Sequence, residues 1–269
     1  MTSLFCDVAL AERIERADAE LIGQLSAAVP EGLVIPIAGG VAGFAGPESP
    51  FTKVAGLGFG GVPDLEEIER AFAERGAHVQ VELPHLADPA IGAALTERGY
   101  QLVSYENVLG LGLNGSYEHV TPPGIEVRRS GDDEFETWSN VVADGVATPD
   151  TQGVVSHEDF PREVLETSLR QLAATGTQRF IALRDGVVAG GASFRIADGI
   201  AQLTGAATAP AHRRRGVQTA LLSARLAEIA AAGCDLAVVT TQPGSKSQQN
   251  VQRRGFDLLY TRAILVKQP

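Results

Sequence analysis

The chain has 269 residues, of which 44% are hydrophobic and 20% are charged, and its formal net charge is -11. This composition is typical of a globular protein with one large domain or two medium ones. The isoelectric point near 4.9 excludes general nucleic-acid binding, which depends on a broad basic surface. An anionic ligand therefore has to meet a local positive site.

The N-terminal residues carry charges every few positions, and no apolar run reaches the ~20 residues needed to span a membrane. We therefore expect no signal peptide, no membrane partner and a cytoplasmic protein. The two cysteines, Cys6 and Cys234, lie far apart among apolar neighbours and form no metal-ligand pattern. Two buried, reduced thiols and no metal site are expected.

The first part of the chain mixes helical and extended patterns. An amphipathic helix is predicted over 9–28, because its apolar residues repeat at helical spacing. A stretch dense in glycine and proline follows and ends in GLGFGG at residues 56–61. The elements predicted next are a helix that begins at Pro63-Asp64, a strand over 77–83, a short helix over 91–98 and a strand over 100–113.

Residues 114–124, NGSYEHVTPPG, have turn residues at both ends, a double proline and no periodicity. They are the predicted linker between an N-terminal domain over 1–113 and a C-terminal domain over 125–269. Both predicted domains end in an Arg-Gly-aromatic turn followed by a strand, which indicates a diverged tandem duplication.

A second series of predicted strands and helices begins after the linker. Hairpins come first and a strand–helix–strand–helix–strand run follows, which predicts an α/β (α+β) fold with a mixed central sheet flanked by helices. The predicted strands cover 125–130, 178–185, 187–196, 200–209, 235–241 and 256–267, and the predicted helices cover 132–144, 158–174, 216–233 and 245–254.

Three consecutive arginines, Arg213, Arg214 and Arg215, precede the helix that opens at Gly216. A helix N-terminus presents unpaired amide donors and partial positive charge, yet this first turn holds no carboxylate. An anion resolves the local repulsion, and a residue without a side chain lets a phosphate approach the amides. The stretch predicts a diphosphate-binding loop, whereas a solvated loop paired with acidic neighbours is the alternative.

The same helix has an expected buried face and an expected exposed face. Leucine and isoleucine repeat at helical spacing on the buried face, while Arg225 and Glu228 are expected to point outward. Gly233 ends the helix at the usual C-terminal position.

At these residues the chain resembles the GNAT superfamily of acyl-CoA-dependent N-acetyltransferases. Thr208-Ala209-Pro210 followed by Arg213 to Gln218 is similar to the central family signature, and SQQNVQRRGF at 247–256 is similar to a second element. The resemblance covers about residues 124–267. It implies two GNAT-like domains of the tandem type, with a degenerate N-terminal half, and acetyl-CoA as the donor substrate.

The resemblance also implies a donor site. The residues from the arginine loop into the helix would bind the CoA pyrophosphate, and the preceding strand would splay from its neighbour so that its backbone meets the pantetheine and the acetyl carbonyl. A fixed backbone N–H at that carbonyl would stabilise the oxyanion. The implied donor-binding residues are Ala206, Thr208, Arg213, Arg214, Arg215, Gly216, Val217, Gln218, Thr219 and Asn250.

Several positions depart from the family pattern. Gln218 stands where a small residue is usual, so its side chain has to turn away from the phosphates, and Val251 stands where many members have a tyrosine acid. Ser247 and Tyr260 are the candidates to replace that acid. The central strands carry no glutamate, so the general base is a water chain, a residue of the N-terminal half or one of three acids, Asp144, Glu158 and Asp159.

Three functions follow from these observations. The first is an N-acetyltransferase that moves acetyl from acetyl-CoA to an amine of a small molecule or peptide, and the second is a non-catalytic acyl-CoA-binding pseudoenzyme. The third is an NAD(P)-dependent oxidoreductase using the G-x-G-x-x-G spacing of Gly56, Gly58 and Gly61. The carboxylates that follow at 64–67 oppose a pyrophosphate there. The acceptor and the oligomeric state, including a homodimer, stay open.

Overall fold

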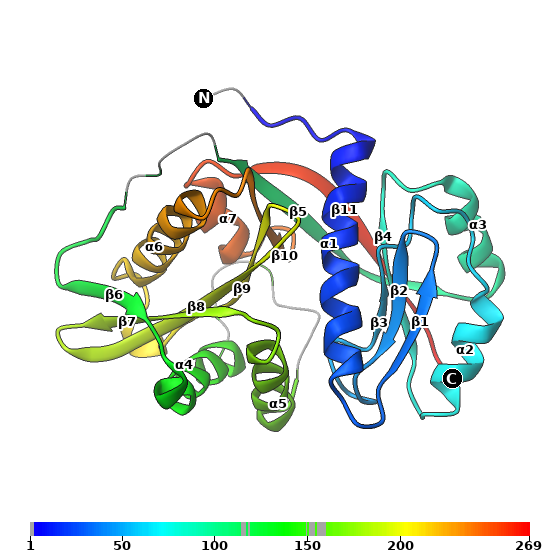
Figure 1. Ribbon diagram of the computed structural model, residues 1–269, viewed down its shortest axis with the longest axis horizontal. Coiled ribbons are helices and arrows are strands. Elements are labelled where there is room, and N and C mark those ends of the chain that lie inside the picture. The colour runs from blue at the N-terminus through cyan, green and yellow to red at the C-terminus, as the bar shows by residue number, and fades with distance from the viewer. Residues whose placement is uncertain (1–2, 114–116, 118, 149, 151–153, 155–159) are drawn as a thin grey trace. The chain divides into compact units, whose positions relative to one another are not determined.

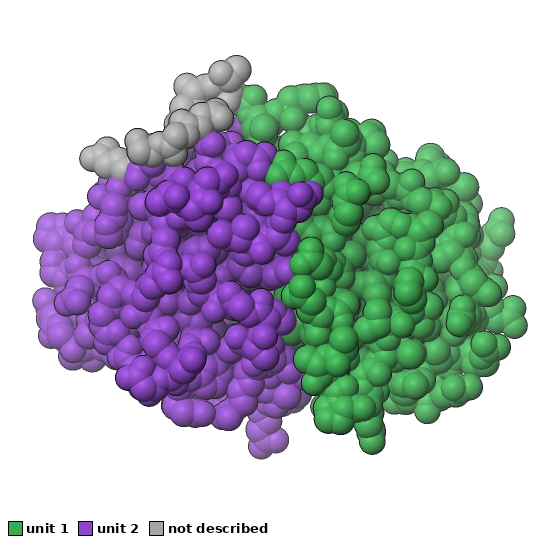
Figure 2. Space-filling model, in the orientation of Figure 1, with its two compact units in different colours: residues 1–108, 258–269 green, residues 109–257 purple. Residues whose placement is uncertain are grey.

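The computed structural model describes residues 3–113, 117, 119–148, 150, 154 and 160–269 (Figure 1). Its contacts group the chain into two compact units (Figure 2). We call residues 1–108 with 258–269 the N-terminal unit, and residues 109–257 the C-terminal unit. The chain passes from the first unit into the second within β5 (Gln101–Gly112) and returns at the start of β11 (Asp257–Lys267).

The domain boundaries read from the sequence stay a prediction, and part of the predicted linker, 114–116 and 118, lies outside the described residues. The units of the structure are not divided at that linker. The strand that ends the chain belongs with the first part of the sequence, whereas residues 109–112 of β5 belong with the second.

The N-terminal unit is a mixed sheet with helices on both faces. Its strand order is β1-β2-β3-β4-β11, and β11 runs antiparallel to β4. Its further elements are α1 (Val8–Ala27), β1 (Leu33–Ile37), β2 (Gly40–Phe44), β3 (Lys53–Ala55), α2 (Leu65–Ala73), β4 (Val79–Pro84) and α3 (Pro89–Glu97).

Alternation along the strands builds the two layers of this unit. Val41 and Ala55 pack with α1, whereas Ala42 and Val54 pack with α2 and α3 on the opposite face. Successive strand residues point to opposite faces, so both faces of β2 and β3 are covered, and apart from Lys53 the residues of these strands are apolar or small.

The strands β1 and β2 lie within the stretch that is dense in glycine and proline. Pro36 lies inside β1, which is the edge strand of the sheet. A proline is tolerated at an edge because its missing N–H removes no ladder bond there. Frequent glycine and proline residues are therefore compatible with strands. Because they interrupt the alternating apolar pattern, the sequence did not predict β1 and β2.

The C-terminal unit is a second mixed sheet, with strand order β10-β9-β8-β7-β6. Helices α6 and α7 pack on one face and α4 and α5 on the other. Its elements are β6 (Ile125–Arg129), the 3₁₀ turn η1 (Asp132–Glu134), α4 (Phe135–Ala147), α5 (Arg162–Ala173), β7 (Gln178–Arg184), β8 (Val187–Ala197), β9 (Ile200–Thr208), η2 (Pro210–His212), α6 (Val217–Ala231), β10 (Leu236–Thr241) and α7 (Lys246–Gln252).

The mixed sheets flanked by helices confirm the predicted fold class. Both cysteines are free, and Cys234 is buried as expected, whereas Cys6 is half-exposed near the N-terminus. Among the described helices, none combines the length and the apolar composition that crossing a membrane requires.

Candidate functional site: a donor loop beside two diverging strands

The arginine loop leads into a helix that no side chain caps. Gly216 precedes α6 with φ 87°, and the first turn of α6 contains no acid. The first amides of a helix have no intrahelical partner, so Val217, Gln218 and Thr219 present N–H groups at this end. Side chains cap four other helices at this position, namely those of Asp7, Asp64, Asp88 and Ser245. The start of α6 therefore offers uncapped amide donors.

The three arginines of the loop have different surroundings. The guanidinium of Arg213 donates to Gly145 O at 3.0 Å and to Thr148 O, at the C-terminal end of α4. Arg214 is 61% exposed and lies 3.4 Å from Asp150, and Arg215 is exposed. The side chains of Arg214 and Arg215 are accessible to an anion, whereas that of Arg213 holds α4.

Beside this loop the strands β9 and β10 diverge. Their parallel pairing extends only from Ile200 and Leu236 to Gln202 and Val238, although β9 continues to Thr208. A β-ladder satisfies the backbone groups of both strands, so the end of the ladder leaves groups of β9 without a partner from β10.

The register of β9 shows which residues face the divergence. Ala209 donates its N–H to Ala189 O of β8, and alternate residues of a strand direct their backbone groups to the same side. Ala207 therefore faces β8 as well, and Ala206 and Thr208 face the side of β10. The role of these two residues in donor binding stays a prediction.

A β-bulge lies just before this end of β9. Gly205 has φ 51°, and the pairing of β8 with β9 shifts register between Gly191 and Ser193. A Cβ at Gly205 would lie 2.9 Å from Ser193 Oγ, so the close approach requires glycine. Bulges bend a strand and end regular pairing, which is what redirects β9 beyond this point.

The side chain of Gln218 turns away from the amides of its own helix turn. Its Nε2 donates to Thr208 Oγ1 at 3.0 Å, which links the first turn of α6 to the end of β9. A large residue at this position is thus compatible with an anion at the helix N-terminus, because its amide group is engaged elsewhere.

The second predicted element is α7. Ser247 is exposed near the start of this helix, and Asn250 is half-buried. Val251 is 6% exposed and belongs to the apolar core with Phe256. A valine in that position packs and supplies no proton, so among the described residues of α7 the proton donors are polar side chains such as Ser247.

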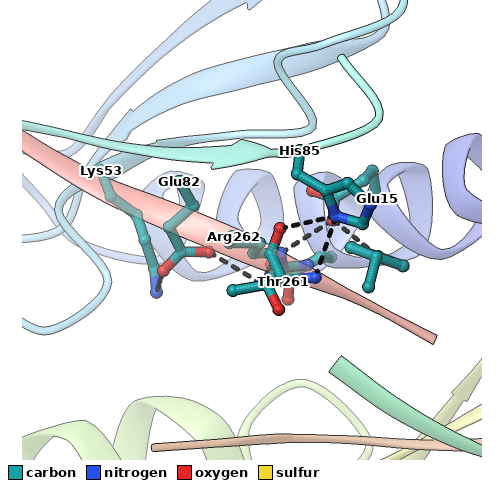
Figure 3. A network of polar contacts seen from close by, with 8 residues as sticks. Glu15, Lys53, Glu82, His85, Thr261 and Arg262 are labelled. Atoms are coloured by element: carbon teal, nitrogen blue, oxygen red, sulfur yellow. Dashed lines mark hydrogen bonds and ion pairs between the residues drawn. The ribbon is translucent and has the colours of Figure 1, made fainter. Parts of the chain in front are cut away.

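Tyr260 lies in the N-terminal unit and contacts a buried polar cluster that includes Glu15, Glu82 and Arg262, which are labelled together with Lys53 in Figure 3. Its hydroxyl donates to Glu15 Oε1 at 2.7 Å, and it is 1% exposed. Burial and the negative charge of Glu15 raise the pKa of Tyr260 well above its usual value. The structure therefore gives this hydroxyl a buried partner, Glu15. Tyr260 belongs to the N-terminal unit, whereas the arginine loop belongs to the C-terminal unit.

Arg262 is the centre of the same cluster, which joins α1, β3, β4 and β11. It donates to Glu15 Oε1 at 2.8 Å and to Glu82 Oε2 at 3.0 Å, and lies 3.2 Å from Asp18. Lys53 Nζ donates to Glu82 at 2.6 Å. Burial raises the pKa of Glu15 to about 7, against the attraction of Arg262. Burial opposes ionisation of Glu82 too, but Lys53 and Arg262 outweigh it and lower the pKa of Glu82.

Of the three acids considered as general base, only Asp144 lies within the described residues. Asp144 on α4 forms an ion pair with Arg162 and is 56% exposed. Glu158 and Asp159 lie outside the described residues. The base therefore stays unassigned.

Two of the three glycines of the dinucleotide-like motif lie close to other residues. A Cβ at Gly56 would lie 2.7 Å from Gly39 O and a Cβ at Gly58 would lie 3.1 Å from Cβ of Ala87, whereas a Cβ at Gly61 would meet nothing within 4 Å. Gly56 is thus packed against the turn between β1 and β2. The helix that follows is capped by Asp64 and has Glu66 and Glu67 in its first turn, so its N-terminus is already neutralised. Nothing at this loop favours a pyrophosphate.

The expectation that Arg225 points outward is wrong. Arg225 is 3% exposed and donates to Ser193 O at 2.9 Å and to Leu221 O at 3.3 Å. Burial lowers its pKa to about 9. The helix can bury this side chain because carbonyls of β8 and of its own preceding turn accept its protons. Glu228 is 26% exposed and pairs with Arg129.

Known proteins resemble this chain in sequence over part of its length and in fold. Residues 146–256 match the Acetyltransferase (GNAT) family. A GCN5-related N-acetyltransferase from Kribbella flavida has the same fold, with a TM-score of 0.69, 23% identity, and coverage of 98% of this chain and 97% of that one. A tandem GNAT protein from the clavulanic acid biosynthesis pathway has a TM-score of 0.58 at 14% identity, with the same coverages, 98% and 97%. No curated protein matches the chain by sequence.

Proposed function

We propose that this protein is an acetyltransferase of the GNAT family that transfers an acetyl group from acetyl-CoA to an amine of a small molecule or peptide, a proposal that the match of residues 146–256 to that family supports. The observation that carries the proposal is the uncapped start of α6 beside the divergence of β9 and β10. At this place the amide donors and the arginines bind the diphosphate of acetyl-CoA. The end of β9 that is not paired with β10 binds the pantetheine arm, which leads to the thioester.

The residues present fit this donor. The backbone amides from Arg214 to Thr219 and the side chains of Arg214 and Arg215 bind the phosphates. The backbone of Ala206 and Thr208 holds the arm and the thioester carbonyl, since both residues face β10 beyond the last ladder pair. Acetyl-CoA supplies the activated acyl group.

The chain then promotes attack by alignment and by oxyanion stabilisation. The amine nitrogen bonds to the acetyl carbon while the carbon–sulfur bond breaks, the amine proton leaves to a base, and the thiolate takes up a proton. A backbone N–H fixed on β9 stabilises the charge on the carbonyl oxygen without reorganisation. A thiolate is a good leaving group, with a thiol pKa of about 8.5, so an acid is helpful but not obligatory. This explains how a domain with Val251 at the acid position sustains transfer.

The acceptor class is inferred from charge alone. The net charge of -11 favours a cationic amine, such as an amino sugar, a polyamine or a peptide amine. The rival function is acyl-CoA binding without catalysis, which the packing of Val251 in the core favours.

Two measurements test the proposal. Titration calorimetry with acetyl-CoA should show saturable binding, and a screen of amines should release thiol only when amine, protein and acetyl-CoA are all present. The matched control is a variant with Arg214→Ala and Arg215→Ala, which should fold and lose binding. Binding without thiol release for any amine would support the pseudoenzyme, and absence of binding would refute the donor site.

A further inference from the structure

The hydroxyl of Thr241 is buried and has no hydrogen-bond partner in the described part of the chain. The residue is 5% exposed. A buried hydroxyl without a partner costs free energy, so such groups in folded proteins are few and call for a physical reason.

Thr241 is the last residue of β10, and it lies beyond the final ladder pair of that strand with β9, Val238 with Gln202. Along a strand, alternate residues share a face, so Thr241 lies on the same face as Ala237 and Val239. Those two residues belong to, or pack against, the core that α6 covers. The hydroxyl therefore lies on the α6 side of the sheet, at the place where β9 has left β10.

The comparison with Thr208 shows what is unusual. Thr208 ends β9 as Thr241 ends β10, and its hydroxyl also lies on the α6 side, since it accepts from Gln218. Each of the two diverging strands thus ends in a buried threonine on the same side. The hydroxyl of Thr208 has a partner, Gln218, whereas that of Thr241 has none in the described ranges of the chain.

We propose that Thr241 is a donor-binding residue whose hydroxyl forms a hydrogen bond with a polar group of the pantetheine arm of acetyl-CoA. This inference rests on the proposed function and adds a side chain of β10 to a site otherwise built from β9 and α6. The arm contains amide groups, and a hydroxyl can donate to a carbonyl or accept from an N–H. The unsatisfied hydroxyl is then a cost of the ligand-free protein that donor binding removes.

The neighbouring residue provides a matched control. Thr240 has the same side chain on the opposite face of β10 and is exposed. Thr241→Val replaces the hydroxyl by a methyl group of similar size, Thr241→Ser keeps the hydroxyl, and Thr240→Val removes a hydroxyl that is solvated.

The experiment measures ligand-free melting temperature and the dissociation constants of three ligands, acetyl-CoA, CoA and adenosine 3′,5′-diphosphate, which lacks the arm. Thr241→Val should raise the ligand-free melting temperature by about 2–4 °C, because the unpaired hydroxyl is gone. The same substitution should also weaken the binding of acetyl-CoA and CoA about 5- to 10-fold and leave the binding of adenosine 3′,5′-diphosphate unchanged. Thr241→Ser and Thr240→Val should bind all three ligands like the parent protein.

The possible results separate this inference from the proposed function. If the parent protein binds neither acetyl-CoA nor CoA, the proposed function fails and this inference with it. If the parent binds and Thr241→Val binds equally well, only the role of Thr241 is overturned, and a buried water then satisfies the hydroxyl. Equal loss of all three ligands by Thr241→Val would indicate general damage and would also overturn the assignment.

Discussion

The hydroxyl of Tyr260 on the last strand donates to Oε1 of Glu15 on the first helix, across 245 positions of the sequence. Arg262 donates to the same oxygen at 2.8 Å, while Oε2 of Glu15 is buried and has no hydrogen-bond partner among the described residues. The cluster holds three carboxylates, of Glu15, Asp18 and Glu82, against two cations, of Lys53 and Arg262. The excess negative charge and the unpaired oxygen both favour a proton on Glu15.

Glu15→Gln should remove a pH dependence of stability. Burial raises the pKa of Glu15 from its usual value near 4.5 to about 7, so the folded protein holds this proton more tightly than the unfolded chain. Its contribution is complete below pH 4.5 and is lost as the pH rises through 7, which amounts to about 3 kcal/mol as an upper limit. The free energy of unfolding of the parent protein should therefore fall between about pH 5 and pH 8, and that of Glu15→Gln should not.

The unfolding experiment needs a probe of the correct unit. The single tryptophan, Trp138, lies in the C-terminal unit, so far-UV circular dichroism in urea is the appropriate signal. The pKa of Glu82 is lowered, so this group stays ionised above pH 5 and contributes no slope in that window. Parallel pH profiles for the parent and Glu15→Gln would contradict the protonated state of Glu15.

Tyr260→Phe should lower stability and spare catalysis. The hydroxyl is buried against Glu15, and its loss removes a hydrogen bond to a carboxylate, at a cost of about 1–2 kcal/mol. We expect kcat to stay within about twofold of the parent value in a thiol-release assay. Tyr105→Phe is the control, since that tyrosine is 50% exposed. A fall in kcat of tenfold or more with unchanged acetyl-CoA affinity would make Tyr260 the acid after all.

The sequence was sufficient for elements that have a regular period and insufficient for contacts between distant residues. The helix predicted over 9–28 is found at Val8–Ala27, because its apolar repeat is undisturbed. The strand Leu33–Ile37 was missed because Pro36 is compatible with an edge strand, which a sequence pattern does not identify as an edge. The partnership of Glu15 with Tyr260 depends on the placement of β11 beside β4, and no local signal encodes that placement.

The same limit applies to the site. The arginine loop, Gly216 and the uncharged first helix turn follow one another in the chain, so the sequence alone could identify them. Arg225 was misplaced because a charge usually indicates an exposed face, and only the structure shows the carbonyls that accept its protons. Thr241 was overlooked as one hydroxyl in a run of strand residues. Its inward position in the alternation of VVTT is the signal that could have identified it.

Substitutions of Arg213 and Arg215 should separate an effect on protein stability from an effect on acetyl-CoA binding. Arg213 donates to two carbonyls at the end of α4, so Arg213→Ala should lower the melting temperature by about 2–4 °C, with a smaller effect on acetyl-CoA affinity. Arg215 is exposed, and Arg215→Ala should leave the melting temperature unchanged while weakening acetyl-CoA about 5- to 10-fold. Titration calorimetry at two salt concentrations should show that the effect of Arg215 shrinks as salt rises.

Arg128→Ala is the control for loss of one exposed arginine elsewhere in the C-terminal unit. Its side chain pairs with Glu134 and is 42% exposed. The distinction would be wrong if Arg213→Ala and Arg215→Ala gave the same affinity loss with no change in melting temperature.

Gly216 and Gly233 lie at the two ends of α6 and give the sharpest comparison. Both have left-handed backbones, with φ 87° and 79°, so alanine costs about 1–2 kcal/mol at either position. A Cβ at Gly233 meets nothing within 4 Å, whereas at Gly216 it would lie 3.0 Å from Cγ of Pro122. Gly216→Ala should therefore also shift the loop whose amides bind the donor and weaken acetyl-CoA at least tenfold. Gly233→Ala should lose stability through the strained backbone alone and bind acetyl-CoA as tightly as the parent protein. Equal losses of acetyl-CoA affinity in the two variants would show that the amides at Gly216 are not the donor site.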